Sequence, residues 1–294
     1  MTEMIDVYDA DFKLIGKEER NEAHRKGLWH QAFLCWVIRP NGKLIVQLRS
    51  KNKSTSPNLL DVSCGGHIIS GETVEDGVRE LKEELGLDVD FKELSYLGYF
   101  KWATDKGSKT IIPYHNREFC HTFFYKCDQP LNKYVLQAEE LDGIFELDLA
   151  SGRKLFSKEV NEIKIKGYLR KNDNTLEKAE KTVGTKDFTK YRNFWLRTFN
   201  LAEDFLNGRK YLDIYIDNLK KPISPYSYDY TASFLKDDTS DKSYNEVSVN
   251  ETKGVQRWSS SYLAKVLRSS NKEQARQYYD QGISYMKKNR IIFI

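Results

Sequence analysis

Apolar runs separated by turn signals dominate the first half of the chain. Residues 31–39 (QAFLCWVIR) are typical of a buried strand, residues 40–43 (PNGK) of a turn, and residues 44–48 alternate as a second strand. Further strands are expected at residues 94–100, 118–125 and 143–147, with a short strand and turn at residues 4–16. The pattern therefore predicts a strand-rich module.

One helix is well marked inside this module. Val74, Val78, Leu81 and Leu85 recur at steps of three and four residues, which places them on one helical face. Thr73 with Asp76 three residues later is typical of a capping box, and Gly86 is expected to end the helix. With the apolar face turned to the core, the glutamates of RELKEE are expected on the other side.

The second half is less regular. Residues 162–169 alternate as an exposed strand, residues 187–206 carry an aromatic helical face, and residues 221–254 are rich in Ser, Asp and Tyr. We expect one domain over residues 1–210, with an insertion near 157–186. Residues 211–294 are expected to form a C-terminal extension that is partly irregular and then helical.

Composition narrows the class of protein. The 294 residues are 39% hydrophobic and 31% charged, with a formal net charge of +4, too mild to indicate nucleic acid or a membrane surface as partner. The four cysteines show no CxxC spacing, and the first residues show no signal-peptide pattern. No apolar run is long enough to span a bilayer. These features favour a soluble cytoplasmic protein with buried free thiols.

The acidic helix follows a glycine-rich loop, and this arrangement indicates metal chemistry. Glu80, Glu83 and Glu84 are three and four residues apart, so their carboxylates lie close together. Mg²⁺ prefers oxygen ligands and completes its shell with water and substrate phosphates. Gly66 lets the loop pass near the metal or offer a carbonyl, and Arg79 is placed to steady the carboxylates. The alternative is an ordinary charged surface helix.

The whole constellation resembles the signature of the Nudix hydrolases. The matching residues are Gly66, Glu72, Arg79, Glu80, Leu81, Glu83, Glu84, Gly86 and Leu87. One departure is that six residues, not the usual seven, separate Glu72 from Arg79. The resemblance implies an α/β (α+β) fold, an α/β/α sandwich around a mixed sheet. It also implies hydrolysis of a pyrophosphate bond in a small nucleotide or related diphosphate, with Mg²⁺ or Mn²⁺ held by Glu80, Glu83 and Glu84.

The remaining parts of such a reaction are sought outside the helix. A metal-bound water needs a proton acceptor, for which Glu118, Glu139 and Glu140 are candidates. Arg49 and Lys51 precede the glycine loop and are either phosphate ligands or part of a solvated basic loop. A homodimer is the default expectation for a soluble enzyme.

A narrower likeness covers residues 6–149, whose layout is similar to isopentenyl-diphosphate isomerase, a branch of the same fold. His24, His30 and His67 match that enzyme's three metal-binding histidines, and Glu118 matches a glutamate of its site. The match fails at the catalytic cysteine, because Gly65 stands in its place and Cys64 lies one residue away, pointing to the opposite face of a strand. We therefore favour a hydrolase, with the isomerase and a non-catalytic nucleotide sensor as alternatives. The three histidines are either ordinary surface or core residues or the ligands of a second metal or phosphate site.

Overall fold

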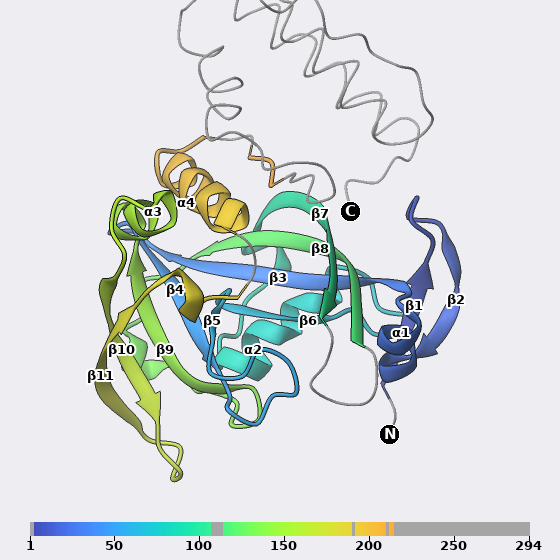
Figure 1. The fold of residues 1–294 in the computed structure, drawn as a ribbon, viewed down its shortest axis with the longest axis horizontal. Coiled ribbons are helices and arrows are strands. Elements are labelled where there is room, and N and C mark those ends of the chain that lie inside the picture. The colour runs from blue at the N-terminus through green and yellow to red at the C-terminus, as the bar shows by residue number, and fades with distance from the viewer. Residues whose placement is uncertain (1–2, 107–113, 190–191, 210–211, 215–294) are drawn as a thin grey trace, which may run out of the picture. The chain divides into compact units, whose positions relative to one another are not determined.

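The computed structural model describes residues 3–106, 114–189, 192–209 and 212–214 (Figure 1). The strands are β1 (Met4–Tyr8), β2 (Leu14–Glu19), β3 (Trp29–Arg39), β4 (Lys43–Arg49), β5 (Leu60–Asp61), β6 (Cys64–His67), β7 (Ser95–Lys106), β8 (Tyr114–Lys126), β9 (Leu141–Asp148), β10 (Ile163–Arg170) and β11 (Leu176–Val183). The α-helices are α1 (Arg20–Lys26), α2 (Arg79–Leu85), α3 (Leu149–Ser157) and α4 (Arg192–Leu206). The strands confirm the predicted strand-rich module.

Strand β3 is the centre of a mixed sheet. It pairs in parallel with β8, so that His30 lies opposite Glu118, and antiparallel with β6, so that Ala32 lies opposite His67. The main path through the sheet runs β11-β10-β9-β4-β3-β1-β2, with β7 joined through β8. This pairing collects residues distant in sequence at one end of β3, which is where the candidate site forms.

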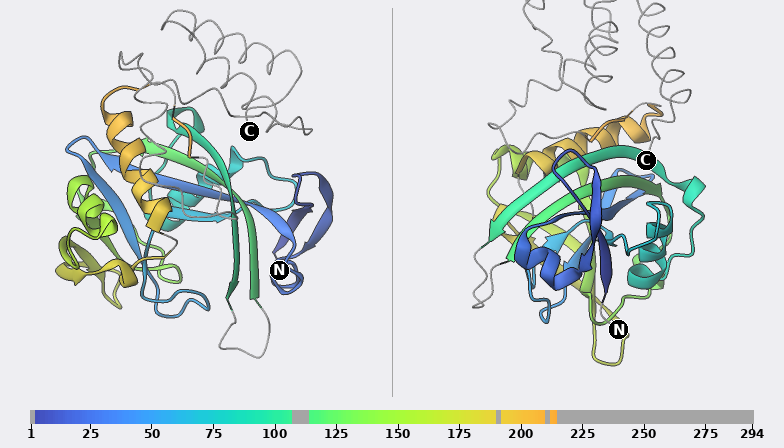
Figure 2. Two further views of the ribbon diagram at one scale, coloured as in Figure 1. Left: turned by 45° about the horizontal axis from the view of Figure 1, so that its top comes forward. Right: turned by 90° about the vertical axis from the view of Figure 1, so that its right-hand side faces the viewer.

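The two faces of the sheet carry separate cores. Leu34 and Trp36 of β3 face a core that includes side chains of α3 and α4, whereas Phe33 and Cys35 face a core that includes Leu81 of α2. Alternate residues of a strand point to opposite faces, and an apolar strand buried on both sides has this composition. Figure 2 shows α4 on one side of the sheet, and Figure 1 labels α2 on the other. The structure thus confirms the expected layered fold of helices around a mixed sheet.

Helix α2 is shorter than the sequence pattern predicted. Regular α-helix begins at Arg79, and Asp76–Val78 form a single 3-10 turn before it. Asp76 accepts hydrogen bonds from both the backbone N–H and the hydroxyl of Thr73, so only one half of the predicted capping box forms. Gly86 ends the helix as predicted, with a left-handed φ of 68°. The short helix still presents the acidic residues to β6.

The region expected as an insertion extends the sheet. The predicted strand at residues 162–169 is β10, which forms a hairpin with β11 and pairs with β9. The aromatic helix is present as α4, beginning at Arg192. The chain divides into two compact units, residues 1–221 and 222–294. The second unit, with the irregular and helical segments predicted there, lies outside the described residues, so the proposed domain boundaries stay a prediction.

The cysteines are free thiols, with Cys35, Cys64 and Cys120 buried, as expected. Among the described residues, no helix is both long and apolar enough to cross a membrane.

Candidate active site

The acidic helix lies directly against strand β6, and glycine makes this approach feasible. A Cβ atom on Gly66 would fall 2.2 Å from Oε1 of Glu80, and one on Gly65 would fall 2.6 Å from Cδ2 of Leu34. Both glycines are therefore required by close contact, one on each face of β6. The carboxylate of Glu80 occupies the space that any side chain at position 66 would fill.

Two of the three helix glutamates are buried, which corrects the prediction that all three lie on the side of the helix away from the core. Glu80 is 8% exposed and Glu84 is 3% exposed, whereas the side chain of Glu83 is 49% exposed. The reason is that other segments of the chain cover the side of α2 that carries Glu84. Glu84 accepts a hydrogen bond from the Gly65 N–H at 3.2 Å, and its own carbonyl accepts one from Gln137 at 3.1 Å. A helical pattern does not show such covering by other segments.

Arg79 ties the acidic residues together. Its guanidinium donates to Glu72 at 3.0 Å, to Glu80 at 2.6 Å and to Glu83 at 3.2 Å. It also donates to the carbonyl of His67 at 3.0 Å. Glu72 in turn accepts a hydrogen bond from the Ile69 N–H, so the shorter spacing between Glu72 and Arg79 still brings the two side chains together. One cation therefore fixes three carboxylates and the end of β6.

Burial makes the charged forms of Glu80 and Glu84 costly, and Arg79 offsets only part of this cost. Burial, followed by the charges of Glu80 and Glu140, raises the pKa of Glu84 well above its usual value of 4.5. Burial also raises the pKa of Glu80, against the opposing charge of Arg79. Buried carboxylates are costly unless a cation pairs with them or coordinates them. Carboxylate oxygens are the ligands that a hard divalent cation such as Mg²⁺ or Mn²⁺ prefers. Among the described residues, however, it is His24, His30 and His67, and not the helix glutamates, that place their ligand atoms within 4.8 Å of one another.

Glu140 joins this group from the segment before β9. It forms an ion pair of 2.5 Å with Lys53, and its charge is one of the causes of the raised Glu84 pKa. The carbonyl of Glu140 accepts a hydrogen bond from the Ser50 N–H, which fixes the basic loop beside it. Glu139 is exposed next to it. Of the predicted proton acceptors, Glu140 is the one that lies beside the helix carboxylates.

The histidines form a second group. His24 of α1, His30 of β3 and His67 of β6 place one ring nitrogen each within 4.8 Å of the others. Oε1 of Glu118 lies 3.6 Å from Nε2 of His67 and 3.9 Å from Nε2 of His30. The fold thus brings together all four residues that the isomerase likeness indicated.

Backbone carbonyls orient two of these rings. Nδ1 of His30 lies 2.9 Å from the Leu28 carbonyl, and Nδ1 of His24 lies 3.3 Å from the His115 carbonyl. A ring that donates through Nδ1 keeps its Nε2 lone pair, the arrangement common in metal-ligating histidines. Burial lowers the pKa of His24 to about 4 and that of His30 to about 3, so both rings are neutral at physiological pH. The donor set fits a transition metal such as Zn²⁺ or Mn²⁺.

The two groups lie on opposite faces of β6. Gly66 faces Glu80, whereas His67, the next residue, faces Glu118. Glu118 therefore belongs to the histidine group and not to the helix carboxylates. The His67 carbonyl, held by Arg79, connects the groups through the backbone.

The basic residues predicted to meet phosphate differ in their surroundings. Arg49 is engaged by the protein, donating to Asp61 and to the carbonyls of Thr55 and Ser56. Lys51 has an exposed side chain, and its backbone N–H donates to Asp142. Arg49 thus shapes the loop, and Lys51 lies on its surface.

Cys64 lies away from the histidine group. Its thiol is fully buried beside Cys35 in the core under α2, and burial raises its pKa well above 9.0. The sequence analysis did not identify Glu3, whose Oε1 is 3.6 Å from Nδ1 of His67, or Tyr114, whose ring stacks on His24 at 4.4 Å. No spacing signal marks either residue, because tertiary pairing alone brings them to the site.

Comparison with known proteins decides the family. The sequence model of the NUDIX domain matches residues 28–163. An uncharacterized Nudix hydrolase of Clostridium acetobutylicum is 37% identical over 193 residues, which are 65% of this chain and 91% of that relative. The chain belongs to the Nudix hydrolase family. It is accordingly an enzyme of the hydrolase class that acts on phosphorus-containing anhydrides.

Other relatives of this Nudix hydrolase share shorter stretches. The isopentenyl-diphosphate Delta-isomerase of Serratia proteamaculans is 35% identical over 100 residues, 34% of this chain and 56% of that enzyme. A solved structure from Deinococcus radiodurans matches with a TM-score of 0.40 and 24% identity over 53% of this chain and 88% of that one. The isomerase match is partial, so its activity enters only as a candidate.

Proposed function

We propose that this Nudix hydrolase cleaves a pyrophosphate bond in a nucleoside diphosphate derivative or a related diphosphate, with Mg²⁺ or Mn²⁺ at the carboxylate site. The observation that carries the proposal is the pair of buried carboxylates, with Glu80 packed against Gly66 and Glu84 bonded to the Gly65 N–H. A purely structural helix gains nothing from burying two like charges. A bound divalent cation would neutralise them, polarise the diphosphate and acidify a water.

The chain's own residues then have separate tasks. Glu80, Glu83 and Glu84, with Gly66, would hold the cation, and Arg79 fixes Glu80 and Glu83 in place. Glu140 accepts the proton of the attacking water, and the ion pair with Lys53 keeps its carboxylate in position. Lys51 supplies positive charge to a substrate phosphate.

The test is product release from a panel of nucleoside diphosphate derivatives, dinucleotides and isopentenyl diphosphate, with Mg²⁺, Mn²⁺ or a chelator. Glu83→Gln is the informative variant, because its exposed side chain makes unfolding improbable as a cause of lost activity. Glu75→Gln, an exposed glutamate outside the site, is the control. We expect metal-dependent cleavage that falls at least roughly a hundredfold in Glu83→Gln alone. Equal activity in the two variants would contradict the assignment.

A second candidate is an isomerase-like reaction at the histidine group. The convergence of His24, His30, His67 and Glu118 favours it, and the buried position of Cys64 counts against it. Interconversion of isopentenyl and dimethylallyl diphosphate without phosphate release would establish this candidate. Independently of activity, a cobalt titration followed by visible absorption should show histidine ligation that is lost in His67→Gln.

A further inference from the structure

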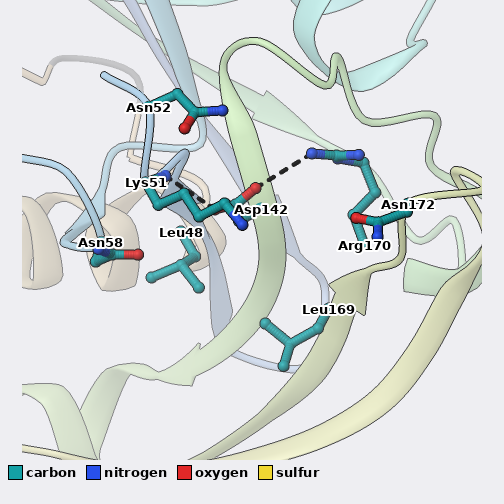
Figure 3. A pocket seen from close by; sticks show the side chains of 8 residues that line it. All are labelled: Leu48, Lys51, Asn52, Asn58, Asp142, Leu169, Arg170 and Asn172. Carbon is teal, nitrogen blue, oxygen red and sulfur yellow. Dashed lines mark hydrogen bonds and ion pairs between the residues drawn. The ribbon is translucent and has the colours of Figure 1, made fainter. Parts of the chain in front are cut away.

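A hollow of about 430 Å³ lies at the end of the sheet where β4 ends and β9 begins. Of the residues proposed for the reaction, only Lys51 is among the described residues that line it. Its walls come from the loop after β4, the start of β9 and the β10–β11 hairpin (Figure 3). Apart from Ile163, the hairpin lies after the residues 28–163 that match the NUDIX domain. One wall of this hollow is therefore an addition to the common domain.

The hollow adjoins the proposed reaction site through two short links. Lys51 and Lys53 belong to the same loop, and Lys53 forms the ion pair with Glu140. On the opposite wall, Asp142 is two residues after Glu140 and accepts a hydrogen bond from the Lys51 N–H at 2.8 Å. A substrate whose diphosphate lies at Glu84 and Glu140 can extend into the hollow from there.

The charged side chains of Asp142 and Arg170, which line the hollow, already form hydrogen bonds within the protein. Asp142 accepts from Lys51 through one oxygen and from Arg170 at 3.2 Å through the other (Figure 3). The guanidinium of Arg170 also donates to the carbonyls of Leu141, Lys171 and Ala138 and to Asn174. These two residues therefore build the wall and have no free donor or acceptor of full strength for a ligand.

The groups that remain for a ligand are amides and one ammonium. Within the part of the chain that the structure describes, no hydrogen bond or ion pair engages the side chains of Asn52, Asn58, Asn172 or Lys51. Leu48 and Leu169 provide an apolar floor, and none of the described residues that line the hollow is aromatic. Arg49 donates hydrogen bonds to two carbonyls of the loop after β4, and Asn58 in this loop has a left-handed φ of 59°. The conformation of the loop that carries Asn52 and Asn58 is therefore fixed before a ligand binds.

We infer that this hollow is a subsite for a sugar attached to the diphosphate. Side-chain amides both donate to and accept from hydroxyl groups, the leucines pack on the carbon face of a sugar ring, and Lys51 meets an adjacent phosphate. A nucleobase would find no ring to stack on. This inference rests on the proposed function, and it narrows the substrate to a nucleoside diphosphate sugar.

Kinetics of the full chain test the subsite. Asn172→Ala and Asn52→Ala are compared with Asn161→Ala, an exposed asparagine outside the hollow. For a nucleoside diphosphate hexose we expect KM to rise roughly 2- to 10-fold in each pocket variant, with kcat unchanged, as for loss of one hydrogen bond. For the triphosphate of the same nucleoside, which lacks the hexose, KM should not change. Unchanged KM for the hexose derivative, or an equal rise for both substrates, would overturn the inference.

A binding measurement separates this inference from the hydrolase proposal. Calorimetric titration of hexose 1-phosphate into Glu83→Gln protein should show binding that weakens in the double variant Glu83→Gln/Lys51→Ala. If the wild type cleaves no diphosphate but binding depends on Lys51, the subsite stands and the hydrolase proposal fails. If cleavage is found but neither titration nor KM responds to the pocket variants, the hydrolase stands and the subsite falls.

Discussion

At the scale of single residues, the burial of Glu84 lowers the free energy of unfolding of the metal-free protein at neutral pH. Its folded pKa is raised above the ordinary 4.5, so the folded state retains a proton that the unfolded state has released. This difference lowers the free energy of unfolding as pH rises above about 4.5. A neutral side chain of the same shape removes the penalty and keeps the hydrogen bond from Gly65.

We therefore expect Glu84→Gln to raise the metal-free free energy of unfolding at neutral pH by on the order of 1 kcal/mol or more, while metal-dependent activity is lost. Urea denaturation in chelator, beside the exposed control Glu75→Gln, measures the first effect. A thermal scan with and without Mn²⁺ should show that stabilisation by the metal disappears in the variant. A marked loss of metal-free stability would show that the carboxylate is structural.

His121 is a second buried titratable residue, and it lies outside both candidate sites. Its Nδ1 lies 3.0 Å from the Tyr96 hydroxyl and its Nε2 lies 2.9 Å from Oε1 of Gln31. Burial lowers its pKa from 6.5 to about 3, so the unfolded state takes up a proton first as pH falls. The resulting loss of folding free energy begins near pH 6.5 and continues toward pH 3, reaching about 2 kcal/mol near pH 5.

His121→Gln keeps a hydrogen-bonding side chain but cannot titrate. Its free energy of unfolding should therefore fall less than that of the wild type between about pH 7 and pH 5. His24 and His30 act in the same direction, so a part of the slope remains. Denaturation curves at several pH values measure the slope, and identical slopes in both proteins would exclude this role for His121.

At the scale of elements, the predictions of secondary structure were most accurate where a single signal, such as an apolar run or a helix-ending glycine, determines the structure. Strands β3 and β4 have continuous or alternating apolar residues around a Gly42 turn, and α2 ends at Gly86 as its pattern requires. Helices α1 and α3 and strands β2, β5, β6 and β11 were not predicted, and the expected glycine-rich loop at Gly65 and Gly66 is strand β6. In β11, exposed and half-buried charged residues leave little alternation, and pairing with β10 determines its structure. The burial of Glu80 and Glu84 arises from β6, which helical periodicity cannot show.

The contact between α3 and α4 gives a prediction about packing. A Cβ atom on Gly152 would fall 2.6 Å from Cζ of Phe199, although glycine to alanine within a helix is otherwise stabilising by about 0.5–1 kcal/mol. We expect Gly152→Ala to lower the free energy of unfolding by about 1–3 kcal/mol instead, without changing metal-dependent activity. Urea denaturation checks the sign, with Lys154→Ala on the same helix as control. A stabilised variant would show that Phe199 moves aside freely.

At the scale of the whole molecule, β6 is the element on which both sites depend. Its four residues place Cys64 and Gly66 toward α2 and His67 toward Glu118. The sequence motif indicated both sets of residues, and their separation onto two faces follows from strand alternation. The motif could not show which carboxylate from another part of the chain lies beside the histidines and which lies beside the helix glutamates. Pairing of β3 with β8 assigns Glu118 to the histidines, and the segment before β9 assigns Glu140 to the helix.

The same reasoning predicts how the chain should respond to truncation after Lys221, the end of the first compact unit. Every named strand and helix and every residue proposed for the two sites and the hollow precedes residue 207. The truncated protein should therefore unfold cooperatively and keep the metal-dependent kcat and the KM of the full chain. Size-exclusion chromatography, thermal scans and the substrate panel on both forms provide the comparison. If the truncated protein folds but its KM rises by tenfold or more, residues 222–294 contribute to substrate binding. The prediction that the first unit alone contains the whole substrate site would then be wrong.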